Sequence, residues 1–536
     1  MARHFNTAGP NNPAKHYCID PFERINWTEI QQLIDDEKYF VMHAPRQSGK
    51  TTLLQAIVER INDSGRYVAM RFSVQSAQAA LYDLDKGNQI IARQLLRGAQ
   101  FSLPQSFIVT HGQTIMEKEK EPGVLLNKLL TEWAANSEKP IVLLIDEIDA
   151  LIGETLVSVL SQLRDGYIAR PDPFPQSIVL CGVRDVRDYR IQMSNGTFVT
   201  GSSPFNIKTK SLTIGNFSES EVRALYVQHT AETRQIFEES IFPKVMALTG
   251  GQPWLVNALA NELTQEMPEL KDRSRSIGLE EVDEAKEHLI LRRDTHIDQL
   301  VDKLKEERVR RVIEPILNGS AWGKSVSEDD RQYAVDLGLI VVERSEGIRI
   351  ANDIYREVIP RALTSIIEDN FTAQVPKAAF LFPDGRLNFQ KLLSDFQQFY
   401  QENASVWKEK TVYEEAAPQL LLQSWLHRMV NGGGRIEREY ALGRGRADLF
   451  VRFFYQENGE RKEQRFLVEM KIKHGSLEST IEKGLEQTAG YAEMCNPEES
   501  HLIVIDPPVG AKRRRKIKIF TEERIFEGRR IKVWGM

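Results

Sequence analysis

Residues Ala44 to Thr52, with the sequence APRQSGKTT, have the types and spacing of a loop that binds phosphate. They match the pattern G-x-x-x-x-G-K-[ST], except that Ala44 replaces the first glycine. Gly49 lets backbone N–H groups at the start of the next helix approach phosphate oxygens. Lys50 supplies a cation between the β- and γ-phosphates, and the Thr51 hydroxyl completes the Mg²⁺ shell. We expect ATP and Mg²⁺ to contact Ala44, Pro45, Arg46, Gln47, Ser48, Gly49, Lys50, Thr51 and Thr52.

Two adjacent acidic residues follow a second apolar run, IVLLIDE at 141–147. A phosphate-binding loop needs a carboxylate at the end of a neighbouring buried strand to hold the metal ion. Asp146 is expected to bind Mg²⁺ through water. Glu147 is then placed to polarise the attacking water as a general base.

Arg184 directly follows a third apolar run, SIVLCGV at 177–183. P-loop ATPases, which this arrangement resembles, place a residue that senses the γ-phosphate at this position, so the resemblance implies that role for Arg184. The alternative is a structural arginine that pairs with Asp185 or Asp188. The sequence leaves both interpretations open.

A second group of chemically competent residues lies near the C-terminus, in GRGRADLFV and FLVEMKIK. In a strand, residues i and i+2 share a face, so Glu469 and Lys471 project together while Met470 points the other way. With Asp448 on the neighbouring strand, two carboxylates converge on a hard cation such as Mg²⁺ or Mn²⁺. Lys471 would orient the attacking water, whose pKa the metal lowers.

Helices on either side of these strands carry further polar candidates. The preceding helix is expected in YEEAAPQLLLQSWLHRMV; the PD-(D/E)XK nucleases that this segment resembles carry an acid there, which would be Glu415, with Glu414 as the competing choice. Gln487 and Tyr491 are four residues apart on the following helix, so they share one helical face.

The elements that must position the first site alternate in type along residues 1–215. Apolar runs separated by helices predict an α/β domain with a parallel sheet that is covered on both faces. Ser218 and Glu221 form a capping box that starts a helical region, and Pro253 starts a further helix. The strands are expected at 39–44, 66–74, 141–147 and 177–183.

The rest of the chain divides into further segments. A helix-rich stretch ends in two short strands around RSEG, and Asn352 can cap the last helix, as in a winged helix. Prolines and a glycine in AQVPKAAFLFPDG (373–385) indicate a linker. We expect a P-loop core at 1–215, a helical lid at 216–300, a winged helix at 301–365, a linker at 366–400 and a C-terminal α/β domain at 401–536.

These motifs resemble two known families. Residues 17–365, with the Gly250-Gly251-x-Pro253 turn, resemble AAA-like P-loop ATPases of the STAND type. The C-terminal segment resembles the PD-(D/E)XK nuclease superfamily, in which the roles of Asp448, Glu469, Lys471, Glu415 and Gln487 are catalytic or metal-binding; Ala447 replaces its usual proline. HYCIDPFERI and NGGGRIEREYALGRGRADL are similar to prokaryotic proteins that fuse the two, which implies mobile-element or defence biology.

Composition limits the function classes. The chain has 536 residues, 27% of them charged, with a net charge of −6 and three cysteines. It contains no run of about 20 apolar residues, no secretory leader pattern and no paired zinc-ligand spacing, so we expect a cytoplasmic protein without a disulfide framework. The C-terminal end is richer in Lys and Arg than in Asp and Glu, which favours nucleic acid as a partner.

Three functions fit this sequence. The leading hypothesis is an ATP-binding and ATP-hydrolysing switch that controls a Mg²⁺- or Mn²⁺-dependent deoxyribonuclease. The alternative is an ATP-dependent switch that binds DNA or a partner and does not cleave. The third is an ATPase that forms a homo-oligomer when triggered.

Overall fold

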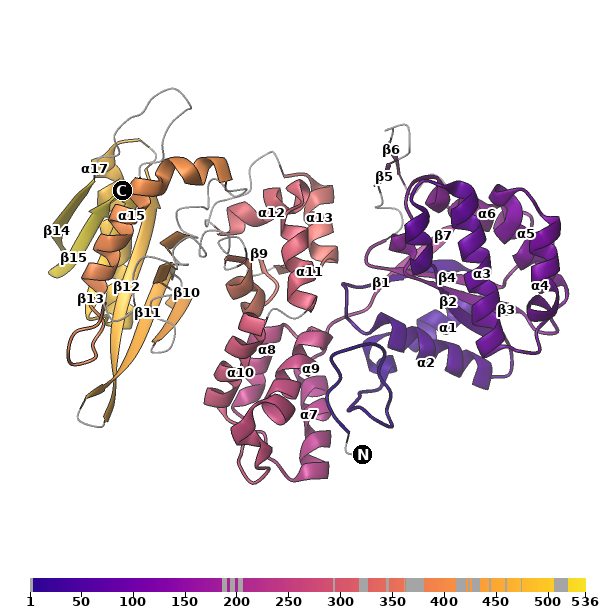
Figure 1. Cartoon of the computed structure of the whole chain (residues 1–536), viewed down its shortest axis with the longest axis horizontal. Helices are drawn as coiled ribbons and strands as arrows, with labels where there is room; N and C mark the ends of the chain where they lie inside the picture. The colour runs from indigo at the N-terminus through magenta and orange to yellow at the C-terminus, as the bar shows by residue number, and fades with distance from the viewer. Residues whose placement is uncertain are drawn as a thin grey trace. The chain divides into compact units, whose positions relative to one another are not determined.

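A computed structural model of the chain contains two compact units (Figure 1). The N-terminal unit comprises Met1–Leu300 and Val326–Arg356, and the C-terminal unit comprises Val301–Ser325 and Glu357–Met536. The structure describes all residues except 1–2, 186–189, 193–197, 201–205, 293–294, 318–325, 344–346, 361, 363–379, 411–420, 423–424, 427–433, 443–444, 458–459, 474 and 506–518.

A parallel five-stranded sheet forms the centre of the N-terminal unit, in the order β2-β3-β4-β1-β7. The sequence predicted its four mostly apolar strands. The parallel sheet that they form confirms the predicted α/β domain. The edge strand β7 was not predicted because its sequence, KTKSLT, is mostly polar. The strands are β1 (Tyr39–His43), β2 (Val68–Ser73), β3 (Ile141–Asp146), β4 (Ser177–Gly182) and β7 (Lys208–Thr213).

Helices cover both faces of this sheet. Alternate strand residues face opposite layers, so Val41 packs with one helical group and Met42 with the other. Figure 1 shows α1 and α2 on one side of the sheet and α3 to α6 on the other. The first group is α1 (Trp27–Asp35) and α2 (Lys50–Asp63); the second is α3 (Leu84–Ser102), α4 (Phe107–Lys118), α5 (Pro122–Ala135) and α6 (Gly153–Ile168). A short hairpin, β5 (Arg190–Gln192) and β6 (Phe198–Thr200), lies between β4 and β7 in the chain.

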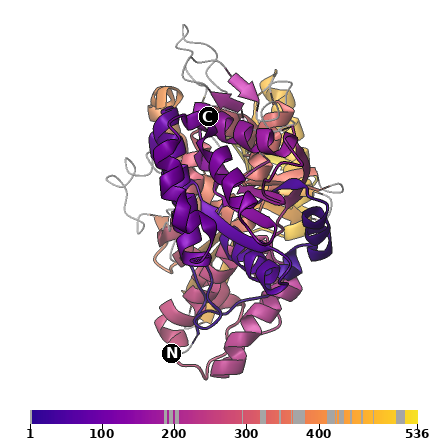
Figure 2. The same ribbon diagram turned by 90° about the vertical axis from the view of Figure 1, so that its right-hand side faces the viewer.

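A helical region, here called the lid, follows the sheet. It contains α7 (Glu219–Thr233), α8 (Ile241–Thr249), α9 (Pro253–Asn261) and α10 (Leu279–Arg292). Ser218 and Glu221 form the predicted capping box, and α9 begins at Pro253 as predicted. The N-terminus lies beside these helices in Figures 1 and 2, and Arg3 pairs with Glu232 of α7 at 2.6 Å.

The segment predicted as a winged helix has helices followed by an antiparallel pair of strands. Asn352 caps the helix at 353–360 through its side chain, which accepts a hydrogen bond from the Tyr355 N–H at 2.8 Å. The segment does not stay within one unit, because Val326–Arg356 belongs to the N-terminal unit and Val301–Ser325 to the C-terminal unit. Its elements are α11 (Thr295–Leu304), α12 (Glu307–Leu317), α13 (Glu328–Asp336), β8 (Ile340–Glu343) and β9 (Gly347–Ile350).

The C-terminal unit is built on a mixed six-stranded sheet in the order β10-β11-β12-β13-β15-β14. Helix α15 (Phe389–Lys410) packs on one face, and α17 (Leu477–Cys495) packs on the other. Along the chain, three strands, then α17, then three further strands follow one another, and the predicted helix around Glu415 lies largely outside the described residues. The strands are β10 (Gly434–Leu442), β11 (Gly445–Glu457), β12 (Glu460–Ile472), β13 (Glu499–Ile505), β14 (Phe520–Phe526) and β15 (Arg529–Gly535).

The predicted linker at 366–400 needs a correction at its C-terminal end. Residues from Phe389 onward form the first turns of α15, and Leu392, Leu393 and Phe396 are completely buried in the core of the C-terminal unit. Their spacing of three and four residues places them on one helical face. The prolines and glycine upstream end before this helix begins.

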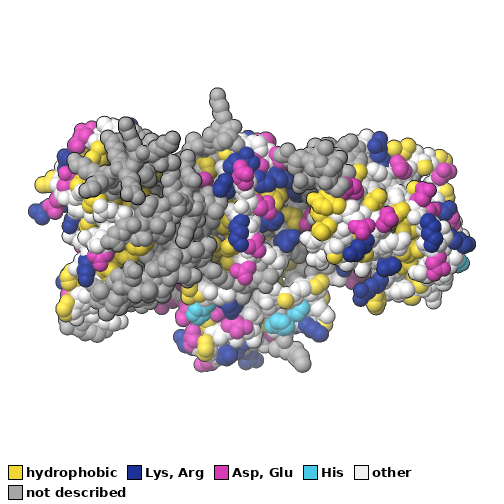
Figure 3. All heavy atoms as spheres, turned by 45° about the horizontal axis from the view of Figure 1, so that its top comes forward, with side chains coloured by type: hydrophobic (Ala, Val, Ile, Leu, Met, Phe, Trp, Pro, Cys, Tyr) yellow, Lys and Arg dark blue, Asp and Glu magenta, His cyan; other side chains and the backbone are white. Residues whose placement is uncertain are grey.

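Two surface properties accompany this fold. In the described part of the chain, no helix has the length and apolar character needed to span a membrane. Over the described part of the face in Figure 3, Lys and Arg side chains are interspersed with Asp and Glu. This pattern matches the near balance of 70 basic and 76 acidic residues.

Candidate functional site

The predicted phosphate-binding loop, residues 44–49, connects the end of β1 to the start of α2. Gly49 has a φ of +82°, a left-handed conformation that glycine adopts without strain, and α2 begins at the next residue, Lys50. Gln47 also has a positive φ, of +55°. The first N–H groups of α2 have no acceptors within the helix, so this turn presents a natural site for an anion.

Lys50 is buried at the centre of this loop. Its Nζ atom donates hydrogen bonds to the carbonyl oxygens of Ala44 at 2.9 Å and Pro45 at 2.8 Å. Ser48 Oγ donates to the same Pro45 carbonyl at 2.7 Å, and Arg24 Nη1 donates to the Ser48 carbonyl at 2.7 Å. The loop is therefore held in shape by its own side chains and by Arg24, with a cation at its centre.

The predicted metal ligands Thr51 and Asp146 lie together. Asp146 ends β3 and is only 1% exposed. Its Oδ2 atom accepts hydrogen bonds from Thr51 Oγ1 at 3.1 Å and from Arg71 Nη1 at 2.8 Å, and its Oδ1 atom accepts one from the Glu147 N–H at 2.9 Å. A hydroxyl and a carboxylate are the hard oxygen donors that Mg²⁺ prefers, so these residues fit that ion. Arg71 was not predicted.

Glu147 lines the cavity next to this pair. It has a left-handed backbone, with φ of +59°, which turns the chain at the end of β3. Burial raises the pKa of its carboxyl group, and the negative charges of Asp149 and Asp146 raise it further, while Lys50 lowers it. A carboxylate with a raised pKa accepts a proton more readily than an exposed one, which suits a general base.

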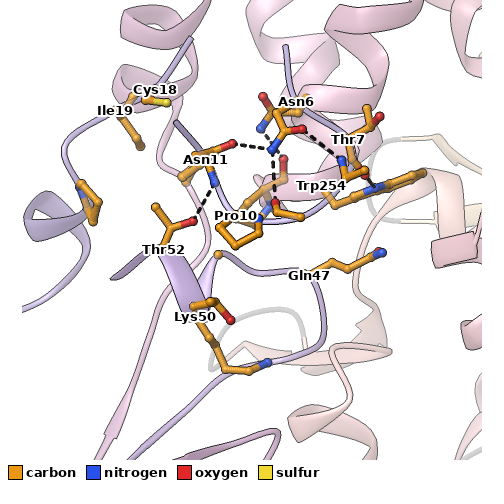
Figure 4. A pocket seen from close by; sticks show the side chains of 18 of the residues that line it. Asn6, Thr7, Pro10, Asn11, Cys18, Ile19, Gln47, Lys50, Thr52 and Trp254 are labelled. Carbon is orange, nitrogen blue, oxygen red and sulfur yellow. Dashed lines mark hydrogen bonds between the residues drawn. The ribbon is translucent and has the colours of Figure 1, made fainter. Parts of the chain in front are cut away.

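A cavity of about 270 Å³ lies over the start of α2. It is lined by the loop and α2, by the N-terminal segment and by the lid, as Figure 4 shows. Apolar side chains from the lid and its approach, Phe217, Leu225, Pro253 and Trp254, contribute to the wall. This mixture of polar and flat apolar groups suits a ligand with a phosphate end and a planar end.

The contribution of the N-terminal segment was not predicted. The Asn11 N–H donates to Thr52 Oγ1 at 3.1 Å, and Trp254 Nε1 donates to the Thr7 carbonyl at 2.9 Å (Figure 4). This segment is polar and lacks any helical or strand period, so no local pattern marks it as a binding element. Arg24, which holds the loop, does fall within HYCIDPFERI, the stretch that carried the family resemblance.

The loop also contacts the lid and the segment around β8. Gln252 Nε2 of the lid lies 3.4 Å from the Arg46 carbonyl and 3.3 Å from the Gln47 carbonyl. A Cβ atom on Gly338, which has φ of +73°, would lie 2.9 Å from Pro45 Cγ. The loop is therefore in contact with both elements.

His296 joins the loop to α11 and to the helix at 353–360. Its Nδ1 atom lies 2.5 Å from Gln47 Oε1, and its Nε2 atom lies 2.5 Å from the Tyr355 hydroxyl. Its ring also stacks on Trp254, with the ring centres 4.8 Å apart. Burial lowers the pKa of His296 to about 4.

Arg184 has partners that neither sequence interpretation named. It is 4% exposed and lies within 3.3 Å of Asp329 and 3.4 Å of Asp336, both on α13, with its guanidinium over the ring of Tyr333. Among the described ion pairs, Asp185 pairs with Lys208. Asp188 lies outside the described residues.

In the C-terminal unit, Glu469 and Lys471 lie together on β12. Glu469 is 2% exposed, and Lys471 Nζ donates to its Oε1 atom at 2.7 Å. The backbone of Asp448 lies in β11, next to Leu449, which pairs with Val468. The side chain of Asp448 is not among those that the structure describes.

The remaining candidates of this second group were predicted on the helices before and after the strands. Gln487 lies on α17 with its side chain exposed, and Tyr491 on the same helix is half-buried. Glu415 and Glu414 fall outside the described residues. In the described part of the chain, no three His, Cys, Asp or Glu side chains cluster as a metal site.

Comparison with known proteins identifies one part of the chain. Residues 24–273 match the model of a family described as "AAA-like domain". No curated protein sequence matches the chain. The chain therefore contains an AAA-like P-loop domain of the ATPase type, built on an α/β fold.

Solved structures were also found to be similar. A Walker-type ATPase of Pyrococcus abyssi is 13% identical, with a TM-score of 0.45, over 66% of this chain and 99% of that one. The RuvB Holliday junction branch migration motor of Thermotoga maritima is 13% identical, with a TM-score of 0.32, over 62% and 95%. Cdc6p from Pyrobaculum aerophilum is 13% identical, with a TM-score of 0.33, over 64% and 93%.

Proposed function

We propose that this chain, whose residues 24–273 form an AAA-like domain, is an ATP-hydrolysing switch that controls a metal-dependent nuclease in its C-terminal unit. The observation that carries the proposal is that Lys50, Thr51 and Glu147 line one cavity, while Asp146 accepts hydrogen bonds from the Thr51 hydroxyl and the Glu147 N–H just behind them. These four side chains supply a cation for phosphate, two metal ligands and a base. Hydrolysis of a nucleoside triphosphate needs each of these.

In this mechanism the protein first binds the phosphates. The N–H groups at the start of α2 donate to phosphate oxygens, and Lys50 exchanges the Ala44 and Pro45 carbonyls for the β- and γ-phosphates. Thr51 and Asp146 would hold Mg²⁺, which neutralises phosphate charge when it is bound. Glu147 orients the attacking water and takes up its proton, and its raised pKa favours that step.

The contacts of the loop support a role for the nucleotide as a switch. The carbonyl groups that Lys50 releases belong to Ala44 and Pro45, and Pro45 contacts Gly338 in the turn before β8. Gln252 of the lid reaches the next two carbonyl groups of the loop. Exchange of the Lys50 partners therefore alters the surfaces against which the lid and the turn pack.

The proposed nuclease rests on the pairing of Glu469 and Lys471 on β12, together with Asp448 on β11. A buried glutamate held by a lysine is suited to a metal and a water molecule, and Mg²⁺ or Mn²⁺ would serve. Arg444, Arg446 and the basic run KRRRKIK at 512–518 would bind DNA phosphates. Nucleotide control would protect host DNA, which suits a defence or mobile-element role in the cytoplasm.

The test is cleavage of linear, supercoiled and single-stranded DNA with Mg²⁺ or Mn²⁺, with and without ATP. Lys471→Ala is expected to abolish cleavage, and Lys50→Ala is expected to change its response to ATP. Lys473→Ala, just beyond the same strand, is the matched control and is expected to cleave.

Other results would support a different function or refute part of this one. DNA binding that depends on ATP, without cleavage of any substrate, would leave a non-cleaving switch. An increase in molar mass on addition of ATP, measured by light scattering, would indicate a homo-oligomer. ATP hydrolysis unaffected by Lys50→Ala would refute the assignment of the nucleotide site itself.

A further inference from the structure

The guanidinium group of Arg71 donates a hydrogen bond to Asp146, the carboxylate that is proposed to hold the metal. Arg71 lies in the middle of β2, and its Nη1 atom donates to Asp146 Oδ2 at 2.8 Å. The same oxygen accepts the Thr51 hydroxyl at 3.1 Å. This arrangement is built into the sheet, because β2 and β3 are neighbours and Ser73 lies opposite Asp146.

The burial of Asp146 makes this ion pair important. Its side chain is 1% exposed, whereas that of Arg71 is 24% exposed. A carboxylate removed from water needs a countercharge, and Arg71 supplies it at hydrogen-bonding distance. Among the described ion pairs, Arg71 is the partner recorded for Asp146.

A divalent cation at the same carboxylate would replace that countercharge. Two cations at one carboxylate oxygen repel each other, more strongly in a buried site than in water. The Thr51 hydroxyl would also turn its lone pairs, rather than its hydrogen atom, toward the metal. Metal held by Asp146, directly or through a water molecule, therefore weakens the Arg71 hydrogen bond.

We propose that Arg71 is a positioning residue that competes with Mg²⁺ for Asp146 and so sets the Mg²⁺ concentration at which nucleotide binds tightly. This inference rests on the proposed function of the nucleotide site. Without metal, Arg71 neutralises Asp146 and reduces its repulsion of the phosphates. With metal, the weakening of the Arg71 hydrogen bond offsets part of the affinity gained.

The test measures binding and does not depend on turnover. A fluorescent ADP analogue is titrated into the full chain in EDTA and at a series of free Mg²⁺ concentrations. Arg71→Met keeps the apolar stem and removes the guanidinium group. We expect the ratio of affinities with and without Mg²⁺ to rise about tenfold in this variant, with a matching fall in half-saturating Mg²⁺, since a hydrogen bond to a charged group is removed.

Two further variants make the result specific. Arg66→Met is the matched control, because Arg66 lies just before β2 and pairs with an exposed carboxylate of Asp35; its ratio is expected to equal that of the wild type. Arg71→Lys keeps a cation but loses the planar donor group. It is expected to shift the ratio in the same direction by about threefold, and it takes the place of Arg71→Met if that variant does not fold.

The outcomes separate the two hypotheses. A ratio within twofold of the wild type in a folded Arg71 variant, while the wild type binds nucleotide with Mg²⁺, overturns the role of Arg71 alone. A wild-type chain that binds no nucleotide at any Mg²⁺ concentration overturns the proposed function and this inference with it.

Discussion

Acidification is expected to destabilise the N-terminal unit through His296. This side chain is 7% exposed, lies between Trp254 and Tyr355, and uses both ring nitrogens in hydrogen bonds. Burial lowers its pKa from 6.5 to about 4. The unfolded chain therefore binds a proton at a pH where the folded protein does not, and the free energy of unfolding falls as the pH falls from 6.5 toward 4.

The magnitude follows from these two pKa values. At about 1.4 kcal/mol for each pH unit between them, the full effect of protonating His296 is roughly 3 kcal/mol. Between pH 7 and pH 5.5, the part that is lost is about 1.2 kcal/mol. His296→Phe keeps a ring between Trp254 and Tyr355 but cannot titrate, so its free energy of unfolding should lack this dependence on pH.

The measurement is the free energy of unfolding in urea for the wild type and His296→Phe, at pH 7 and at pH 5.5. Other titrating groups are common to both proteins, so they cancel in the difference between them. That difference should decrease by about 1.2 kcal/mol at the lower pH. His111→Phe, at an exposed position on α4, controls for the exchange of histidine for phenylalanine. A wild-type minus variant difference that is equal at both pH values would refute the role assigned to His296.

Three other substitutions test separate parts of the site. Gly251→Ala should lower the free energy of unfolding by more than about 1–2 kcal/mol, because its φ is +67° and an added Cβ would lie 2.0 Å from a backbone oxygen. Gly65→Ala is the control: its φ is +68°, but the space around it is open, so thermal unfolding should show only the cost of the left-handed backbone. Glu147→Gln should reduce ATP hydrolysis at least about 100-fold while nucleotide affinity stays within a few fold, and equal loss of both would contradict its role as a base. Asn352→Ala should lower the free energy of unfolding in urea by about 1 kcal/mol, because a helix cap is lost. Asn352→Asp keeps an oxygen acceptor and should retain most of that stability.

The parts of the fold that could be predicted are those with a local signal. Four strands of the parallel sheet are mostly apolar, and the loop before α2 carries its glycine, lysine and threonine at fixed spacing. The helix that begins at Phe389 has apolar residues at helical spacing. The prolines before it nevertheless led to a predicted linker that extended to residue 400, past the start of this helix. Strand β7 is the last strand of the sheet among the described residues. Polar residues are tolerated at such an edge, so its sequence carries little signal.

The missed contacts depend on residues far apart in the chain. Arg71 meets Asp146 only because β2 and β3 are adjacent in the sheet, and Arg184 meets Asp336 only because α13 packs in the same unit. Single residues of this kind have no periodicity or spacing from which a partner follows. The same holds for Thr7, which reaches Trp254 across more than two hundred residues.

The N-terminal segment over the cavity has a kinetic consequence. It is fastened to α2 through Asn11 and Thr52, to the lid through Thr7 and Trp254, and to α7 through Arg3. Each neutral hydrogen bond of this kind contributes about 1 kcal/mol, so the segment opens only in a small fraction of molecules at any moment. A nucleotide bound as proposed that left past this segment would have to wait for it to open. Its residence time, rather than the speed of bond cleavage, would then set how long the protein stays in one state.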